Sequence, residues 1–204
     1  MRPSRMMRVV GFNVDRVVSE ATTDPEVLRL DNFGTDVPPP AEAIAATRES
    51  VGTDEANSYT PFTGNSGLRQ AVAARLKKQC NLSYDPDRQI VITAGGTQGL
   101  ISALLAIIEP GDEVLLTDPT YAGMIHRVTF AGGVPMFVPM KVVDRRWRLD
   151  LDMLRAMVTS RTRTMVLSNP NMPSGHVLSE AEWLAIFFRS AEQHIIVALR
   201  DIWA

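Results

Sequence analysis

Residues 90–100 read IVITAGGTQGL, and this stretch decides the fold of the chain. Its β-branched start predicts a strand over residues 90–93, and the pair Gly95-Gly96 predicts a tight turn. The apolar residues that follow predict a helix. A strand, a glycine turn and a helix N-terminus in this order present unpaired backbone N–H groups, which is how many proteins bind phosphate. A tight strand–helix turn without any ligand is the alternative, and these residues alone leave both interpretations open.

The chain after this stretch alternates between short apolar runs and runs of helical length. Within the last helical run, Ser179 and Glu182 have the spacing of a capping box. Strands that alternate with crossover helices favour a mostly parallel sheet covered on both faces. The predicted fold class is therefore α/β, with three layers. The pattern predicts strands at residues 90–93, 113–117, 134–138, 164–168 and 195–199, and helices at 97–108, 121–131, 151–158 and 179–193.

The segment before the glycine turn is expected to hold an arm and two helices. Residues 1–40 include the stiff run Val37-Pro38-Pro39-Pro40 and are interpreted as an N-terminal arm, with the main domain over residues 41–204. A helix is expected at 41–50, after Pro40, whose missing N–H costs little at a helix start. A second helix is expected at 68–79, with Ser66 as its N-cap.

Composition excludes several classes of protein. Of 204 residues, 45% are hydrophobic and 22% are charged, and the net charge is −2. This balance is ordinary for a globular protein and gives no basic field for nucleic acid. No apolar run reaches membrane-spanning length. Cys80 is the only cysteine in the sequence, so no disulfide can form within the chain, and a cytoplasmic location is the expectation.

Five further motifs follow one another in a specific order. They are Tyr59 with Gly64 and Leu68-Arg69, then TAGGTQ at 93–98, PGDEV at 110–114, DPTY at 118–121 and NPNMPSG at 169–175. Each is weak alone, and Arg69 is equally well explained as a solvated helix residue. Together they make the chain, from about residue 30 to its end, resemble the pyridoxal-phosphate aminotransferases of class I and II, with the aspartate aminotransferase fold (fold type I). The resemblance implies an incomplete large domain of that fold.

The resemblance implies a cofactor site with a phosphate side and a ring side. Gly95, Gly96 and Thr97 would hold the phosphate of pyridoxal 5'-phosphate through backbone N–H groups and a hydroxyl. Tyr121 would stack on the pyridine ring, unless it is simply a core aromatic. Asn171 would contribute from the 169–175 loop.

Two further residues take implied roles at the edges of this site. Tyr59 would reach the phosphate bound in the partner subunit, since the family is homodimeric. Gly34 would lie beside the substrate. A loop aromatic that covers the core and a plain turn glycine are the respective alternatives.

The lysine that the family chemistry needs is not identified. In the family this lysine forms a Schiff base with the cofactor and moves the substrate proton. The sequence has Lys77, Lys78 and Lys141, and none of them stands in the Ser-x-x-Lys setting of the family. No catalytic residue is therefore assigned. We expect a truncated chain without its C-terminal part and small domain, inactive by itself.

Two other family positions are altered. Met172 stands where an asparagine usually bonds the phenolic oxygen of the cofactor, and methionine cannot donate that bond. Counted without gaps from Gly175, the aspartate that faces the ring nitrogen falls on Arg200 and a tyrosine falls on Trp203. A one-residue insertion would put Asp201 at the ring nitrogen instead.

The function that follows is amino-group transfer between an amino acid and a 2-oxo acid. A lyase or decarboxylase of the same fold is one alternative, because the ring-nitrogen position is altered. A non-catalytic module that associates with a full-length subunit is another, because an exposed sheet edge favours association. No metal is expected, since His126, His176 and His194 lack metal-site spacing and are interpreted as surface or boundary residues.

Overall fold

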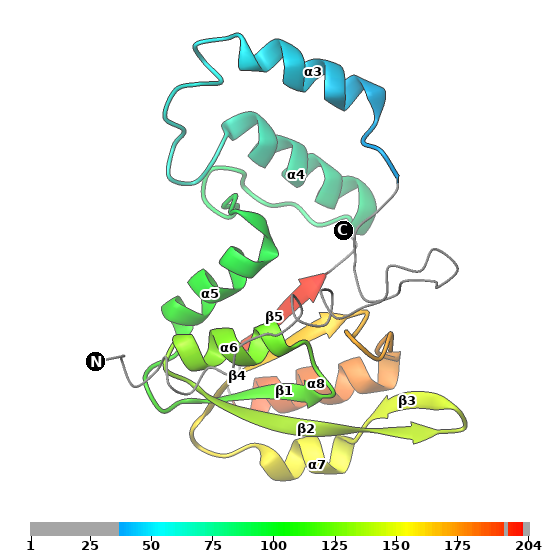
Figure 1. Ribbon diagram of the computed structural model, residues 1–204. Coiled ribbons are helices and arrows are strands. Elements are labelled where there is room, and N and C mark those ends of the chain that lie inside the picture. Colours follow the sequence, from blue (N-terminus) through cyan, green and yellow to red (C-terminus); the bar gives the residue numbers. More distant parts are fainter. Residues whose placement is uncertain (1–36, 194–195, 202–204) are drawn as a thin grey trace, which may run out of the picture. The chain divides into compact units, whose positions relative to one another are not determined.

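The computed structural model describes residues 37–193 and 196–201. These residues fall into two compact units, 37–92 and 93–201, and each is described by itself. The first unit contains helices α3 (Ala41–Val51) and α4 (Ser66–Cys80). The second contains α5 (Gly95–Ile107), β1 (Glu113–Asp118), α6 (Ala122–Phe130), β2 (Val134–Val143), β3 (Arg146–Leu149), α7 (Leu151–Met157), β4 (Thr162–Asn169), α8 (Glu180–Gln193) and β5 (Ile196–Asp201), as Figure 1 shows. Gly34, His194 and Trp203 lie outside the described residues, and the division into an arm and a main domain stays a prediction.

The five strands form one sheet in the order β3-β2-β1-β4-β5. Strands β2, β1, β4 and β5 run parallel, and β3 pairs with β2 in the antiparallel sense. The β1–β2 register runs from Glu113 opposite Val134 to Asp118 opposite Pro139. This confirms the predicted α/β class, because parallel neighbours are joined through helices.

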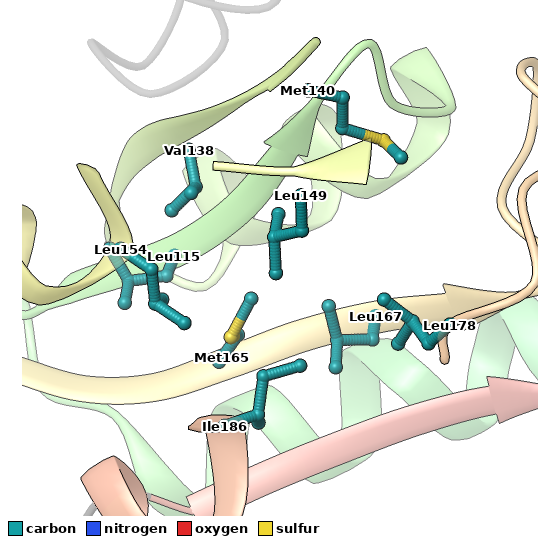
Figure 2. Close-up of a cluster of buried hydrophobic side chains, with 9 residues drawn as sticks. All are labelled: Leu115, Val138, Met140, Leu149, Leu154, Met165, Leu167, Leu178 and Ile186. Carbon is teal, nitrogen blue, oxygen red and sulfur yellow. The ribbon is translucent and has the colours of Figure 1, made fainter. Parts of the chain in front are cut away.

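Both faces of the sheet are covered, as the alternation of side chains along a strand requires. On one face Leu115, Met165 and Leu167 pack with Leu154 of α7 and Ile186 of α8 (Figure 2). On the other face the strand residues in between pack against α5 and α6; this second cluster includes Val114, Leu116, Val166, Leu104, Met124 and Val128. In Figure 1, α6 and α8 accordingly lie on opposite sides of the sheet. The predicted three layers are therefore confirmed.

The predicted set of strands is wrong at two places. Residues 90–93 form no strand in the part of the chain that the structure describes. They have no ladder partner there, and the N–H of Ile92 donates to the carbonyl of Thr63 at 3.0 Å. Strand β3 was not expected. It follows a tight turn in which Asp144 and Arg145 both have positive φ, 50° and 60°, as a primed hairpin turn requires.

The six predicted helices are confirmed, and no helix end is shifted by more than two residues. The cap of α4 is a correction. Ser66 is the first residue of the helix, and the side chain of Asn65 accepts the N–H of Leu68 at 3.1 Å. Asparagine is as good an N-cap as serine, and the helix begins two residues earlier than its apolar pattern suggested.

Arg69 organises the 37–92 unit. Its side chain is buried rather than solvated, so the surface interpretation is wrong. The guanidinium donates to the carbonyl of Pro86 and the hydroxyl of Thr63, and it pairs with Asp87 at 2.8 Å. It also donates to the carbonyl of Gly64. One arginine thus ties α4 to two turns, which a planar guanidinium with five donors does well.

Gly64→Ala is expected to destabilise this unit strongly. Gly64 has φ +91°, and an added Cβ would lie 2.5 Å from the Cβ of Ile92. The backbone strain and the clash together are expected to cost about 2–4 kcal/mol of unfolding free energy. Urea unfolding measures this, with Gly52→Ala as the matched control. Gly52 has φ −83° and its new Cβ would meet only the carbonyl of Glu49 at 3.6 Å. Equal stability of the two variants would contradict the prediction.

Candidate functional site

The topology of the sheet indicates where a ligand site belongs. The chain leaves β1 toward β2 on one side, and β4 lies on the other side, so the strand order reverses between β1 and β4. In open α/β sheets, ligands bind beside such a switch point, at the carboxyl ends of the strands. The segments that follow β1 and β4 there are 118–121 and 169–175, two of the segments singled out from the sequence.

The N-terminus of α5 presents free amides at the predicted phosphate turn. Gly95 has φ +76°, which glycine adopts without strain. The side chain of Gln98 accepts the N–H of Ala94 at 2.6 Å, and the carbonyl of Thr93 accepts that of Gly95 at 2.7 Å. No acceptor among the described residues takes the N–H groups of Gly96 and Thr97. The first turn of α5 also holds no acidic residue, so it keeps the positive end of the helix dipole.

A hollow of about 420 Å³ lies beside this turn, between α5 and α6. Its lining includes Thr97, Gln98, His126 and Arg127, together with apolar side chains, and it contains no carboxylate. The guanidinium of Arg127 donates from Nε to the carbonyl of Thr97 at 3.2 Å. The polar groups around the turn are therefore hydroxyl, amide and cationic groups, which suits an anion.

Tyr121 lies where β1 leads into α6. It is the N-cap residue of α6, with extended backbone angles, and its side chain is half-buried against the cluster of α5 and α6. This position fits a ring that stacks on a ligand and also fits a core aromatic. Its stacking role stays a prediction.

The loop after β4 is shaped by its own hydrogen bonds. The buried side chain of Asn171 donates from Nδ2 to the hydroxyl of Thr117 at 2.8 Å, and its Oδ1 accepts from Ser174 at 2.7 Å. Thr117 in turn donates to the carbonyl of Pro119 at 3.1 Å. Both amide atoms of Asn171 are thus bound within the protein, and they tie the loop after β4 to the loop after β1. A direct contact of Asn171 with a cofactor stays a prediction.

A buried His–Glu pair lies behind this loop, and sequence reasoning missed it. His176 was expected at the surface or boundary, and it is instead one of the buried residues. Its Nε2 lies 3.1 Å from both oxygens of Glu182. Glu182 also accepts the N–H groups of Leu149 and Ser179, each at 2.7 Å. Burial raises the pKa of Glu182, but the hydrogen bonds from Ser179 and Leu149 and the charge of His176 outweigh it, and the net pKa is lowered. The only sequence signal for this pair is the capping box predicted from Ser179 and Glu182, which involves one of its two residues.

The remaining predicted residues are placed only in part. The backbone of Arg200 lies level with Ser168 and that of Asp201 level with Asn169, at the carboxyl end of β5. Tyr59 lies in the other unit and its side chain is exposed. Its role, and that of Gly34, stay predictions.

The three lysines lie in two elements, α4 and β2. Lys77 and Lys78 lie in the last turn of α4. Lys141 on β2 pairs with Asp150 at 2.5 Å, and this hydrogen bond and the carboxylate charge raise the pKa of Lys141. Such an amine stays protonated, whereas a nucleophilic lysine needs a lowered pKa.

The described residues, 37–193 and 196–201, contain no cluster of His, Cys, Asp and Glu that could hold a metal ion. Among their helices none has the length and hydropathy needed to cross a bilayer.

Comparison with known proteins places this chain in a family. Residues 29–202 match the model of the family described as aminotransferase class I and II. A probable N-succinyldiaminopimelate aminotransferase of Mycobacterium tuberculosis is 33% identical over 80% of the chain and 41% of its own length. Human kynurenine–oxoglutarate transaminase 1 is 31% identical over 97% of the chain and 49% of its own length.

The solved structures agree. The N-succinyldiaminopimelate aminotransferase of Mycobacterium tuberculosis superposes with a TM-score of 0.85 at 28% identity, over 98% of this chain and 51% of that one. An alanine aminotransferase of Pyrococcus furiosus gives 0.84 at 26% identity, over 98% of this chain and 51% of that one. The chain spans about half the length of these relatives.

Proposed function

Because the chain belongs to the class I and II aminotransferase family, we propose that the whole protein transfers amino groups between an amino acid and a 2-oxo acid. Members of this family use pyridoxal phosphate. The observation that carries the proposal is the pair of free amides, Gly96 and Thr97, at the start of α5 beside a hollow without carboxylates. The amino-acid substrate is proposed only as a class.

The residues of the site fit the phosphate side of the cofactor. A phosphate dianion needs N–H donors, a positive dipole end and no facing carboxylate, and the first turn of α5 has these properties. We assign the phosphate to the N–H groups of Gly96 and Thr97, with the hydroxyl of Thr97 as a further donor. Tyr121 would then lie along one face of the ring.

The cofactor, when bound, supplies an electron sink that makes the α-hydrogen of an amino acid acidic. The residues of this chain bind and orient it. The Asn171 side chain fixes the loop after β4, so that this loop is preshaped before binding. Met172 offers no donor for the phenolic oxygen. None of the three lysines stands in the family setting, and the pKa of Lys141 is raised by Asp150. We therefore propose that the 204-residue chain binds the cofactor weakly and reversibly, without turnover.

The proposal extends to assembly. Homodimers are the form expected from the resemblance, and Tyr59 would then serve the phosphate of the partner subunit. Its exposed side chain is available for such a contact.

Gly96→Asp is expected to abolish this binding. A carboxylate in the first turn of α5 would lie close to the phosphate and repel it, which should weaken binding at least about tenfold. Equilibrium dialysis of the chain with pyridoxal phosphate measures the dissociation constant. The control is Ser102→Asp, which adds the same charge at an exposed position further along α5. Equal binding by all three proteins would sink the proposal.

A further inference from the structure

Arg127 bridges the first turns of two helices. From the middle of α6, its Nε donates to the carbonyl of Thr97 in α5 at 3.2 Å. Its Nη1 donates to the carbonyl of Gly123 in α6 itself. The flat guanidinium has donors on several edges, so it can hold two carbonyl groups in a fixed geometry. The turn that carries the free amides is therefore joined to the start of α6.

The same guanidinium is packed together with Tyr121. A Cβ added at Gly123 would collide with Cε1 and Cζ of the Tyr121 ring and with Nη1 of Arg127. The ring and the guanidinium thus both lie against the α-carbon of Gly123, where no side chain can be accommodated. Tyr121 is the N-cap residue of α6, and its ring lies against Gly123 in this packing.

We propose that Arg127 is a positioning residue, which holds the phosphate turn and the ring of Tyr121 in register so that one pyridoxal phosphate contacts both. The inference rests on the proposed function. Arg127 acts through Thr97 and Tyr121. Its guanidinium also makes the hollow beside Thr97 more positive, which favours an anion there. A residue that only stabilised the fold would alter the folded fraction but not the orientation of the bound ring.

The test compares Arg127→Met and Arg127→Lys in the 204-residue chain. Equilibrium dialysis gives the dissociation constant for pyridoxal phosphate, and circular dichroism in the cofactor absorption band reports how rigidly the ring is held. For Arg127→Met we expect about tenfold weaker binding and a reduced dichroic signal per bound cofactor, because two charge-assisted hydrogen bonds are lost. Arg127→Lys keeps the cation, so its affinity and its dichroic signal should fall between those of the wild type and Arg127→Met. Arg155→Met is the control, since Arg155 lies on α7 and is exposed.

A second variant tests the packing without removing the charge. Gly123→Ala should displace the Tyr121 ring and Nη1 of Arg127 and lower the dichroic signal, while the positive charge stays in place. Urea unfolding supplies the folded fraction for every variant. Suppose that the wild-type chain binds pyridoxal phosphate and that Arg127→Met has the wild-type affinity and dichroic signal after correction for folding. The inference about Arg127 is then overturned, while the proposed function stands. If the wild-type chain does not bind pyridoxal phosphate, the proposed function fails and the inference with it.

Discussion

Glu182→Ala is expected to lower the unfolding free energy by about 3–5 kcal/mol, because it removes a buried carboxylate that accepts several hydrogen bonds. The Glu182 carboxylate is buried and accepts the N–H groups of Leu149 and Ser179, the Ser179 hydroxyl and His176. Alanine would leave these donors without an acceptor in the interior, and each unsatisfied donor carries a desolvation cost. Urea unfolding at neutral pH measures the loss. Glu180→Ala is the control, since Glu180 lies in the same first turn of α8 but is exposed.

The same residue predicts a pH dependence with a definite sign. The pKa of Glu182 is lowered from its ordinary 4.5 in the folded state, so the folded protein binds fewer protons there than the unfolded chain. Its contribution is therefore full above pH 4.5 and disappears as the pH falls through the folded pKa. The pKa values of Glu113 and Asp150 are also lowered, Glu113 first by its hydrogen bond from Thr159 and Asp150 first by its hydrogen bond from Lys141. Both carboxyl groups are present in the wild type and in the Glu182 variants, so their contributions to the pH dependence cancel in the difference in unfolding free energy.

Glu182→Gln separates charge from hydrogen bonding. Each carboxylate oxygen accepts a backbone N–H, so the amide NH₂ of glutamine would face a donor, and this variant should also be destabilised at neutral pH. The stability difference between wild type and Glu182→Gln should shrink from pH 7 to pH 3. A difference that is constant over this range would show that the carboxylate charge is not what stabilises the pair.

Glu182 also shows which contacts of a residue can be predicted from local sequence and which cannot. The spacing of Ser179 and Glu182 predicts a capping box, and the side chain of Glu182 does accept the N–H of Ser179. The contacts with Leu149 and His176 are set by how α8 lies against the end of β3 and the loop after β4, and no local pattern encodes them. The apolar pattern of residues 90–93 similarly predicts a strand, and the structure has none there. Whether an extended segment joins a sheet depends on a partner strand elsewhere, and no local pattern supplies that information.

In the candidate site, too, one part could be predicted from local sequence and another part could not. The glycine turn is local, so TAGGTQ at 93–98 is sufficient to predict free amides at the start of a helix, and the structure has them. The loop after β4 was expected to supply Asn171 to a cofactor. Its amide also bonds Thr117, 54 residues earlier, because β1 and β4 are neighbours in the sheet, and its contact with a cofactor stays a prediction. Sequence order does not contain that adjacency, and a resemblance carries over residue types without their hydrogen-bond partners.

Asn171→Ala is accordingly expected to affect both stability and binding. The substitution removes the donor to Thr117 and the acceptor for Ser174, and the side chain is buried, so we expect a loss of about 2–3 kcal/mol of unfolding free energy. The loops after β1 and β4 would no longer be tied, and the affinity for pyridoxal phosphate should fall because binding would have to order them.

The coupling between the two loops distinguishes this explanation from a simple cavity. In a double-mutant cycle with Thr117→Val, the combined loss should be smaller than the sum of the single losses by about 0.5–1.5 kcal/mol, since both substitutions break the same hydrogen bond. Ser174→Ala removes only the bond to Oδ1 and should cost less than Asn171→Ala. Strict additivity of Asn171→Ala and Thr117→Val, with unchanged cofactor affinity in both, would mean that the Asn171–Thr117 bond does not join the two loops. The preshaped site would then have to be explained by the backbone bonds of the loop alone, the N–H of Asn171 to the carbonyl of His176 and the N–H of Gly175 to the carbonyl of Asn171.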